Sequence, residues 1–169
     1  MIVRQIRIDF NVTPQVSGYV FVYVIEAEKG CILKDSGVAC CEYIIEKKLL
    51  EDGNSPYDIK AVLLTHAHPD HIGTAAYFRE KYGAKIYCST GERAWIEDID
   101  KQYSERPIPN FYKLAGRSVI VDRIIKDGDT VDILKGVSIK VIGTPGHSAD
   151  EISYKIEDMV FIGDSICGT

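Results

Sequence analysis

Alternation of apolar and polar positions along the chain predicts a protein built from strands and helices in turn. Residues 1–10 alternate between the two kinds of residue, as expected of a strand at the edge of a sheet. The β-branched and aromatic run 19–27 predicts a second strand, and residues 31–34 predict its hairpin partner. The wholly apolar run 61–64 predicts a strand that is buried on both faces.

Helical spacing of apolar residues appears in three further segments. One helix is predicted over residues 38–50, and a second runs from an Asp70 cap to Tyr82, where a glycine follows. A third helix is predicted over 91–103, which contains the one tryptophan of the chain. Residues 106–113 are predicted to be irregular, because their two prolines break helices and sheets.

Short strands separated by glycine, aspartate or charged turns are predicted in the remaining segments. They cover residues 84–88, 130–134, 137–142, 152–156 and 159–162. This mixture of strands and helices predicts an α/β (or α+β) layered protein. The length of 169 residues is typical of one domain, which we expect to span 1–169.

Composition narrows the range of partners and compartments. The 20 basic and 25 acidic residues give a net charge of −5, which argues against general binding of nucleic acids. No apolar run is long enough for a membrane span, and residues 1–10 do not resemble a signal peptide. The five cysteines form no C-x-x-C motif and are odd in number. We therefore expect a cytoplasmic protein without a disulfide framework and without contact with membranes.

Histidine is the residue type that points to chemistry, since three of the four histidines fall within six residues. In an extended segment, residues i and i+2 point the same way, so His66 and His68 are expected to reach one point together. Pro69 then forces a turn, and Asp70 and His71 begin a helix. The segment therefore predicts two ligand pairs aimed at neighbouring points.

Imidazole and carboxylate groups suit zinc and other divalent first-row metals. A catalytic zinc site commonly has three protein ligands and a water, so His147, in a Gly/Pro turn after an apolar strand, is the candidate third ligand. Asp164 ends a later strand and is placed to bridge to a second metal, while Asp35 is placed to hydrogen-bond a ligand histidine from behind. A purely structural role is the alternative for each of these three residues. Cys167 is expected to be a bystander.

The four residues of the H-x-H-x-D-H segment strongly resemble the signature of the metallo-β-lactamase superfamily: His66, His68, Asp70 and His71. Three weaker segments resemble the family's other motifs and occur in the same order: Leu33–Gly37, Thr144–Ser148 and Phe161–Asp164. The Thr-Pro-Gly-His-Ser turn and the lack of a cysteine ligand look more like the glyoxalase II-type hydrolases than the antibiotic-resistance enzymes.

The resemblance implies an αββα sandwich with a metal site on one edge. It also implies that a first metal is held by His66, His68 and His147. A second metal would be held by Asp70 and His71, with Asp164 bridging the two ions. Zinc, as one or two ions, is the expected cofactor, with iron or manganese as alternatives.

The chain departs from the family pattern after Asp164. The family normally supplies a further histidine to the second metal from beyond the bridging aspartate, whereas no histidine follows His147. The last strand and helix of the fold are also missing from the expected elements. We expect that the chain is truncated at its C-terminus; a one-metal site and completion by a neighbouring subunit, hence a homo-oligomer, are the alternatives.

The resemblance implies a metal-dependent hydrolase that cleaves an ester, thioester or lactam-like acyl bond of a small-molecule substrate. A metal lowers the pKa of a bound water to about 7, which gives metal-bound hydroxide at neutral pH. Asp70 is the expected catalytic residue that orients this nucleophile. Two alternatives remain: a single-iron redox or dioxygenase member of the same fold, and a non-catalytic, truncated metal-binding domain.

Overall fold

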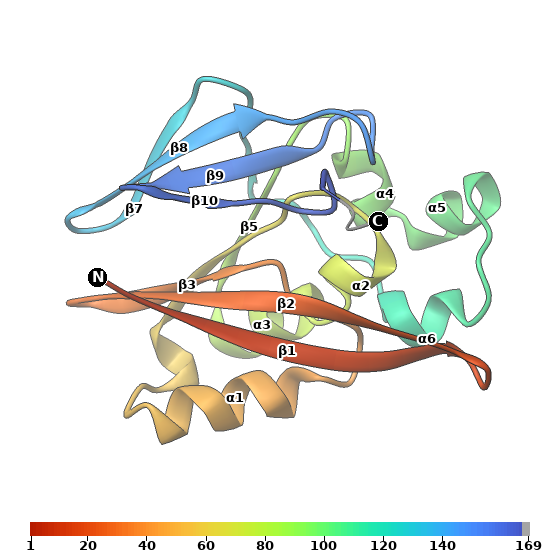
Figure 1. Cartoon of the computed structure of the whole chain (residues 1–169), viewed down its shortest axis with the longest axis horizontal. Coiled ribbons are helices and arrows are strands. Elements are labelled where there is room, and N and C mark those ends of the chain that lie inside the picture. Colours follow the sequence, from red (N-terminus) through yellow and green to blue (C-terminus); the bar gives the residue numbers. More distant parts are fainter. Residues whose placement is uncertain (167–169) are drawn as a thin grey trace.

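The computed structural model describes residues 1–166 as two β-sheets packed face to face, with helices on one side and at one end (Figure 1). Along the six-stranded sheet lie β1 (Ile2–Thr13), β2 (Val16–Ala27), β3 (Gly30–Lys34), β4 (Ile59–Leu63), β5 (Lys85–Cys88) and β6 (Arg123–Ile124). The four-stranded sheet contains β7 (Thr130–Leu134), β8 (Val137–Gly143), β9 (Ile152–Ile156) and β10 (Met159–Phe161). As predicted, the first strand lies at a sheet edge.

Two apolar layers hold the fold together, one on each face of the six-stranded sheet. Successive residues of β4 point to opposite faces. Val62 therefore packs in the layer beneath α1 (Glu42–Glu51) and α3 (Ala75–Tyr82), whereas Leu63 packs in the layer between the two sheets. This confirms the prediction of a strand buried on both faces.

The four-stranded sheet is apolar on its inner face, and its strand β8 is polar on the outer face. Along β8, Val137, Ile139 and Val141 are buried, whereas Ser138 and Lys140 between them are exposed. Within residues 1–166, no helix covers this outer face (Figure 1). The sandwich therefore agrees with the expected αββα architecture without its last helix.

The prediction of one helix that is capped by Asp70 and runs to Tyr82 is wrong, because this segment forms two helices. α2 (Pro69–Ile72) and α3 are separated at Gly73, and His68 rather than Asp70 occupies the cap before α2. Pro69 takes the first helical position, where its missing N–H costs nothing. A Cβ at Gly73 would collide with the backbone of residues 38–39 and with the carbonyl of Leu114, so glycine is required where these segments cross.

Other helix boundaries also differ from the prediction. The first helix begins at Glu42 rather than residue 38, after Cys40 adopts a left-handed conformation. The helix predicted over 91–103 is divided at Asp98 into α4 (Arg93–Glu97) and α5 (Ile99–Glu105). The prediction of an irregular segment over 106–113 is wrong at its end, because α6 (Phe111–Ala115) begins two residues after the second proline.

The helices of this fold are short. None of those within residues 1–166 is long and apolar enough to cross a membrane.

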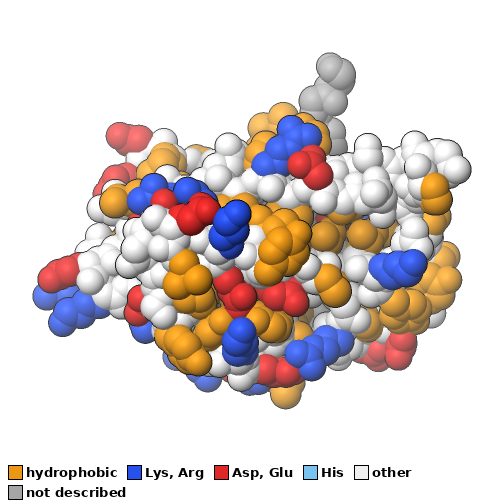
Figure 2. All heavy atoms as spheres, turned by 90° about the horizontal axis from the view of Figure 1, so that it is seen from below, with side chains coloured by type: hydrophobic (Ala, Val, Ile, Leu, Met, Phe, Trp, Pro, Cys, Tyr) orange, Lys and Arg blue, Asp and Glu red, His pale blue; other side chains and the backbone are white. Residues whose placement is uncertain are grey.

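The face that carries α1, seen in Figure 2, shows apolar side chains interrupted by Lys, Arg, Asp and Glu, and no histidine is visible on it. The histidines gather instead at the edge where the two sheets meet.

Candidate metal centre

Strand direction brings the predicted residues to one edge of the sandwich. β3 and β4 are parallel, so Asp35, after β3, and His66 and His68, after β4, lie at the same end of the six-stranded sheet. β8 and β10 both run antiparallel to β9, so His147 and Asp164, beyond their ends, lie together on the other sheet. The candidate site therefore draws its side chains from both sheets.

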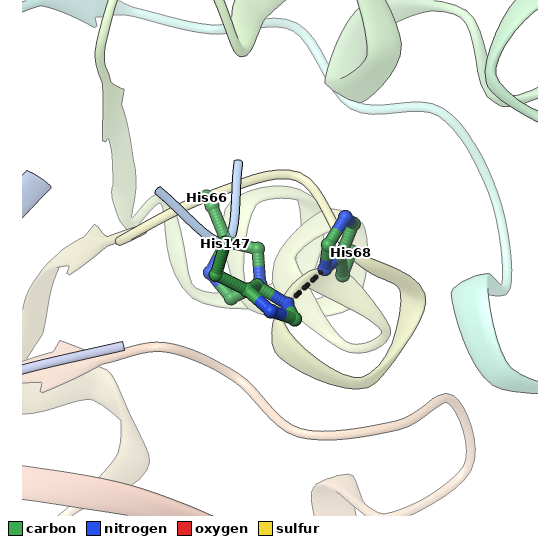
Figure 3. Close-up of side chains that lie close together, drawn as sticks. All are labelled: His66, His68 and His147. Carbon is green, nitrogen blue, oxygen red and sulfur yellow. Dashed lines mark hydrogen bonds between the residues drawn. The ribbon is translucent and has the colours of Figure 1, made fainter. Parts of the chain in front are cut away.

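Three histidines form the first group of candidate metal donors (Figure 3). One ring nitrogen each of His66, His68 and His147 lies within 4.8 Å of the others. His147 Nε2 is 2.7 Å from His68 Nδ1, and the ring centroids of His66 and His68 are 4.4 Å apart. This set matches the first site that the sequence predicts.

A second group contains His66, His71 and Asp164, again with one donor atom each within 4.8 Å of the others. Asp164 Oδ1 lies 3.3 Å from His71 Nε2, and Asp164 Oδ2 lies 3.5 Å from His147 Nε2. The two oxygens of one carboxylate thus face both groups. That is the position required of a bridging ligand.

The structure places Asp70 at the rim of the site rather than within either three-residue group. Its Oδ2 is 3.8 Å from His71 Nε2, and its side chain is 27% exposed. Asp70 lines a cavity of about 170 Å³ together with His68, His147 and Asp164. This carboxylate is therefore accessible to a small molecule at the histidines.

Asp35 sets the orientation of two histidine rings from behind. The Thr65 hydroxyl donates its single proton to this carboxylate, at 3.0 Å, and lies 3.0 Å from His66 Nδ1. That hydroxyl is therefore left as an acceptor for the Nδ1–H of His66. His71 Nδ1 lies 2.7 Å from Asp35 Oδ2 and donates to it in the same way. Both rings are thus held with Nε2 aimed into the site.

Lys34 compensates the buried charge of Asp35. Its Nζ lies 2.6 Å from Asp35 Oδ2, and the two side chains are 3% and 0% exposed. Burial by itself raises the pKa of the Asp35 carboxyl, but Lys34 and then His71 lower that pKa well below its usual range. Asp35 is therefore a permanent anion between a lysine and two histidines.

Burial and the neighbouring charges together divide the histidines into neutral and charged rings in the metal-free protein. Burial and the neighbouring His71 lower the pKa of His66, and burial followed by Arg106 lowers the pKa of His68 to about 3. Burial also opposes charge on His71, but Asp35 and Asp164 raise the pKa of this ring to about 10. At neutral pH, His66 and His68 are thus free bases, whereas His71 carries a proton.

The donor set fits a divalent metal ion. His66 Nε2, which is aimed into the site, is buried and has no hydrogen-bond partner within residues 1–166. A buried ring nitrogen without a partner costs about 1–3 kcal/mol. Neutral imidazoles with an unused lone pair, next to carboxylate oxygens, are the ligands that zinc prefers.

Two residues that support this loop were missed by the sequence analysis. Glu92 is buried and accepts a hydrogen bond from the backbone N–H of Ala67 at 2.8 Å and one from the Ser148 hydroxyl at 2.6 Å. Gln102 donates to the Ala67 carbonyl at 2.6 Å. The peptide between the paired histidines is thus held at both ends. These contacts join segments far apart in sequence, so no local motif reveals them.

One predicted bystander cannot be placed. Cys167 lies outside the described residues, so its relation to the donors remains a prediction. The four cysteines within residues 1–166 are free thiols: Cys31, Cys40, Cys41 and Cys88.

Histidine and aspartate donors on two packed sheets, converging on one edge, define a metal-binding protein of the α/β sandwich class. A sequence model described as the metallo-beta-lactamase superfamily matches residues 17–167. The chain belongs to this superfamily, which confirms the resemblance found in its motifs.

Individual relatives agree with this family. The chain is 29% identical, over 150 residues, to the probable polyketide biosynthesis zinc-dependent hydrolase BaeB of Bacillus velezensis. It is 31% identical, over 136 residues, to a hydroxyacylglutathione hydrolase of Buchnera aphidicola. Among solved structures, the subclass B3 metallo-beta-lactamase BJP-1 of Bradyrhizobium japonicum matches with a TM-score of 0.73 and 28% identity.

These relatives are longer than this chain. The matches cover 89%, 80% and 91% of this chain, but 56%, 42% and 61% of BaeB, the Buchnera enzyme and BJP-1 respectively. Three other curated relatives are covered over 50% to 64% of their length. The family and the fold are therefore shared, and the activity of the whole protein is a separate question.

The charge on His71 predicts that metal binding at the second group releases a proton. A ligand nitrogen must be deprotonated, and the pKa of His71 is about 10, so affinity there should rise about tenfold per pH unit through the neutral range. Calorimetric titration with Zn²⁺ at pH 7–8, in buffers of different ionisation enthalpy, measures the protons released. The wild type should release about one more proton per protein than His71→Ala. Equal release by the two proteins would contradict the charged state of His71.

Proposed function

We propose that this protein is a zinc-dependent hydrolase that cleaves an acyl bond, a thioester or an ester, in a small-molecule substrate. The observation that carries the proposal is a pair of donor groups that share His66. One oxygen of Asp164 lies near His71 and the other near His147, beside an open cavity. The similarity to a zinc-dependent hydrolase and to a hydroxyacylglutathione hydrolase supports the same class of reaction.

In this proposal the site residues divide into metal ligands and residues that position them. His66, His68 and His147 would hold a first zinc ion, and His71, Asp70 and Asp164 would supply ligands for a second. When bound, zinc supplies Lewis acidity, which polarises a carbonyl and makes a water molecule more acidic. Asp35, through Thr65 and directly, fixes the ring orientation of His66 and His71.

The chain's own residues also position the reactants. Asp70, at the rim of the cavity, accepts a hydrogen bond from the attacking water and keeps its lone pair directed at the acyl carbon. Water adds to that carbon, the bond to the sulfur or oxygen of the leaving group breaks, and a proton passes to the leaving group. The products are a carboxylic acid and a thiol or alcohol.

Turnover measurements on the protein as it exists test this proposal. The purified protein is stripped with a chelator and reconstituted with Zn²⁺, and it is then assayed with a thioester, an oxygen ester and a β-lactam. We expect metal-dependent hydrolysis of the thioester or the ester, and a loss of at least about 100-fold in kcat for Asp70→Asn. Asp132→Asn, on the exposed part of β7, serves as the matched control and should retain full activity.

Two results would overturn the proposal. One is the absence of turnover for all three substrates with zinc bound in full, which would favour a non-catalytic metal-binding domain. The other is protein that is purified without added metal and contains iron with little zinc, which would favour redox chemistry.

We also propose a cytoplasmic location and a small-molecule substrate. The free cysteines within residues 1–166 support a reducing compartment. The cavities at the site have volumes of about 170 to 380 Å³, which suits a small ligand.

A further inference from the structure

A single arginine borders the candidate metal centre on the side of α4 and α5. Arg106 lines both the cavity of about 170 Å³, next to Asp70, and a second cavity of about 340 Å³, next to Trp95. Both cavities also contain His68 and His147 in their walls. Among the described residues, no lysine and no other arginine lines either cavity. One positive charge therefore faces any molecule that lies over the paired histidines.

Hydrogen bonds and prolines restrain the backbone around Arg106, so the base of this side chain has a defined position. The Arg106 N–H donates to the Gln102 carbonyl at 2.8 Å and ends α5. Pro107 restricts the conformation of Arg106, and a second proline follows two residues later. Asn110 ties the end of this loop to the Val12 carbonyl, with a bond of 2.6 Å. Little conformational freedom of the loop remains to be lost when a ligand binds.

The guanidinium of Arg106 is not used by the fold. Most other arginines pair with a carboxylate within 3.0 Å: Arg4, Arg7, Arg79, Arg93 and Arg117. Within residues 1–166, the Arg106 side chain has no such bond. Glu92, the carboxylate beside it in the larger cavity, is already bonded to the Ala67 N–H and the Ser148 hydroxyl. An arginine without a partner, in a protein of net charge −5, is available to a ligand.

The walls next to Arg106 add an apolar surface. The Trp95 ring lines the larger cavity, and its centroid lies 6.4 Å from that of His68. Its Nε1 donates to Glu105 at 2.6 Å, which fixes the ring. Ile108 and Phe111 line the smaller cavity. A ligand here meets metal donors, carbon-rich walls and a guanidinium within the same two cavities.

From this arrangement we infer that Arg106 is a specificity-determining residue that binds a carboxylate on the substrate's acyl chain. A guanidinium offers two parallel N–H donors that match the two oxygens of a carboxylate. The inference rests on the proposed hydrolase activity and adds the substrate class, namely an acyl thioester or ester whose acyl chain carries a carboxylate.

A matched pair of substrates tests the inference. One thioester has an acyl chain that ends in a carboxylate, and the other ends in the isosteric, uncharged carboxamide. For the zinc-loaded wild type, we expect kcat/KM for the carboxylate to exceed that for the carboxamide by about 10–100-fold, mostly through KM. The ratio should fall to near one in Arg106→Ala and be partly retained in Arg106→Lys. Arg93→Ala, which removes an arginine that lines neither cavity, should keep the wild-type ratio.

Binding measured without turnover separates this inference from the proposed function. The probes are non-hydrolysable thioether analogues of the two substrates, titrated into the zinc-loaded wild type and Arg106→Ala. Tighter binding of the acid analogue, lost in Arg106→Ala, supports the inference even if no thioester is hydrolysed. Equal binding of the two analogues by the wild type, or equal weakening of both in Arg106→Ala, would overturn it whether or not hydrolysis is observed.

Discussion

Replacing His66 by alanine is expected to remove bound zinc and activity together. His66 belongs to both groups of candidate donors, and its buried Nε2 has no hydrogen-bond partner within residues 1–166. We expect zinc affinity to fall by more than the roughly 10–100-fold that follows loss of a group supporting a ligand from behind. His68→Ala should behave in the same way, since a three-ligand site tolerates the loss of neither histidine. Metal analysis after dialysis, with kcat/KM for a thioester, measures both effects.

Measuring the metal content of His71→Ala as well shows whether the effect of His66→Ala comes from its place in both donor groups. His71 belongs only to the second group, so His71→Ala should lower the metal content less than His66→Ala does. Circular dichroism of the metal-free variants checks that each chain has folded. Unchanged zinc occupancy in folded His66→Ala would show that this histidine is not a ligand.

Asp35→Asn is expected to destabilise the metal-free protein more than substitutions at the metal-facing histidines. The change removes the negative charge that lies 2.6 Å from the Lys34 ammonium, in a region where both side chains are almost fully buried. An unpaired buried charge costs about 3–5 kcal/mol. At roughly 2–4 °C per kcal/mol for a chain of this size, Tm should fall by roughly 6–20 °C. Thermal unfolding followed by circular dichroism measures the shift.

A second readout distinguishes the two roles of Asp35. Asparagine cannot accept hydrogen bonds at both terminal atoms, so it disrupts the contacts to Thr65 and His71 and should weaken zinc binding by about 10–100-fold. Asp9→Asn is the matched control, because Asp9 pairs with Arg7 at the surface, and it should change the stability by less than about 0.5 kcal/mol. A Tm for Asp35→Asn equal to that of the control would contradict the electrostatic role.

Local patterns in the sequence were sufficient to predict most strands and the pairing of His66 with His68. β-branched runs and alternation predicted β2, β4 and β8, because a strand is determined by which of its faces are buried. The spacing of His66 and His68 follows from the period of two in extended backbone. Both features depend on residues close together in the chain.

Several of the failures involve residues that are far apart in sequence. The helix break at Gly73 arises because the backbone of residues 38–39 and of Leu114 crosses there, and no local pattern indicates such a crossing. Glu92 and Gln102 hold the Ala67 peptide from 25 and 35 residues away. Tertiary packing, rather than propensity, decides these features.

The origin of the donors from two sheets has a mechanical consequence. An ion held by His66 and His68 on one side and by His147 on the other would act as a cross-link between the six-stranded and four-stranded layers. Its binding energy would add to the cohesion of the apolar layer between them, by about 4 kcal/mol at a free metal concentration of 1,000 times Kd. The smaller sheet, which has no helix on its outer face within residues 1–166, would gain most from this tether. The availability of metal would then determine both the reaction at this edge and the stability of the packing between the two sheets.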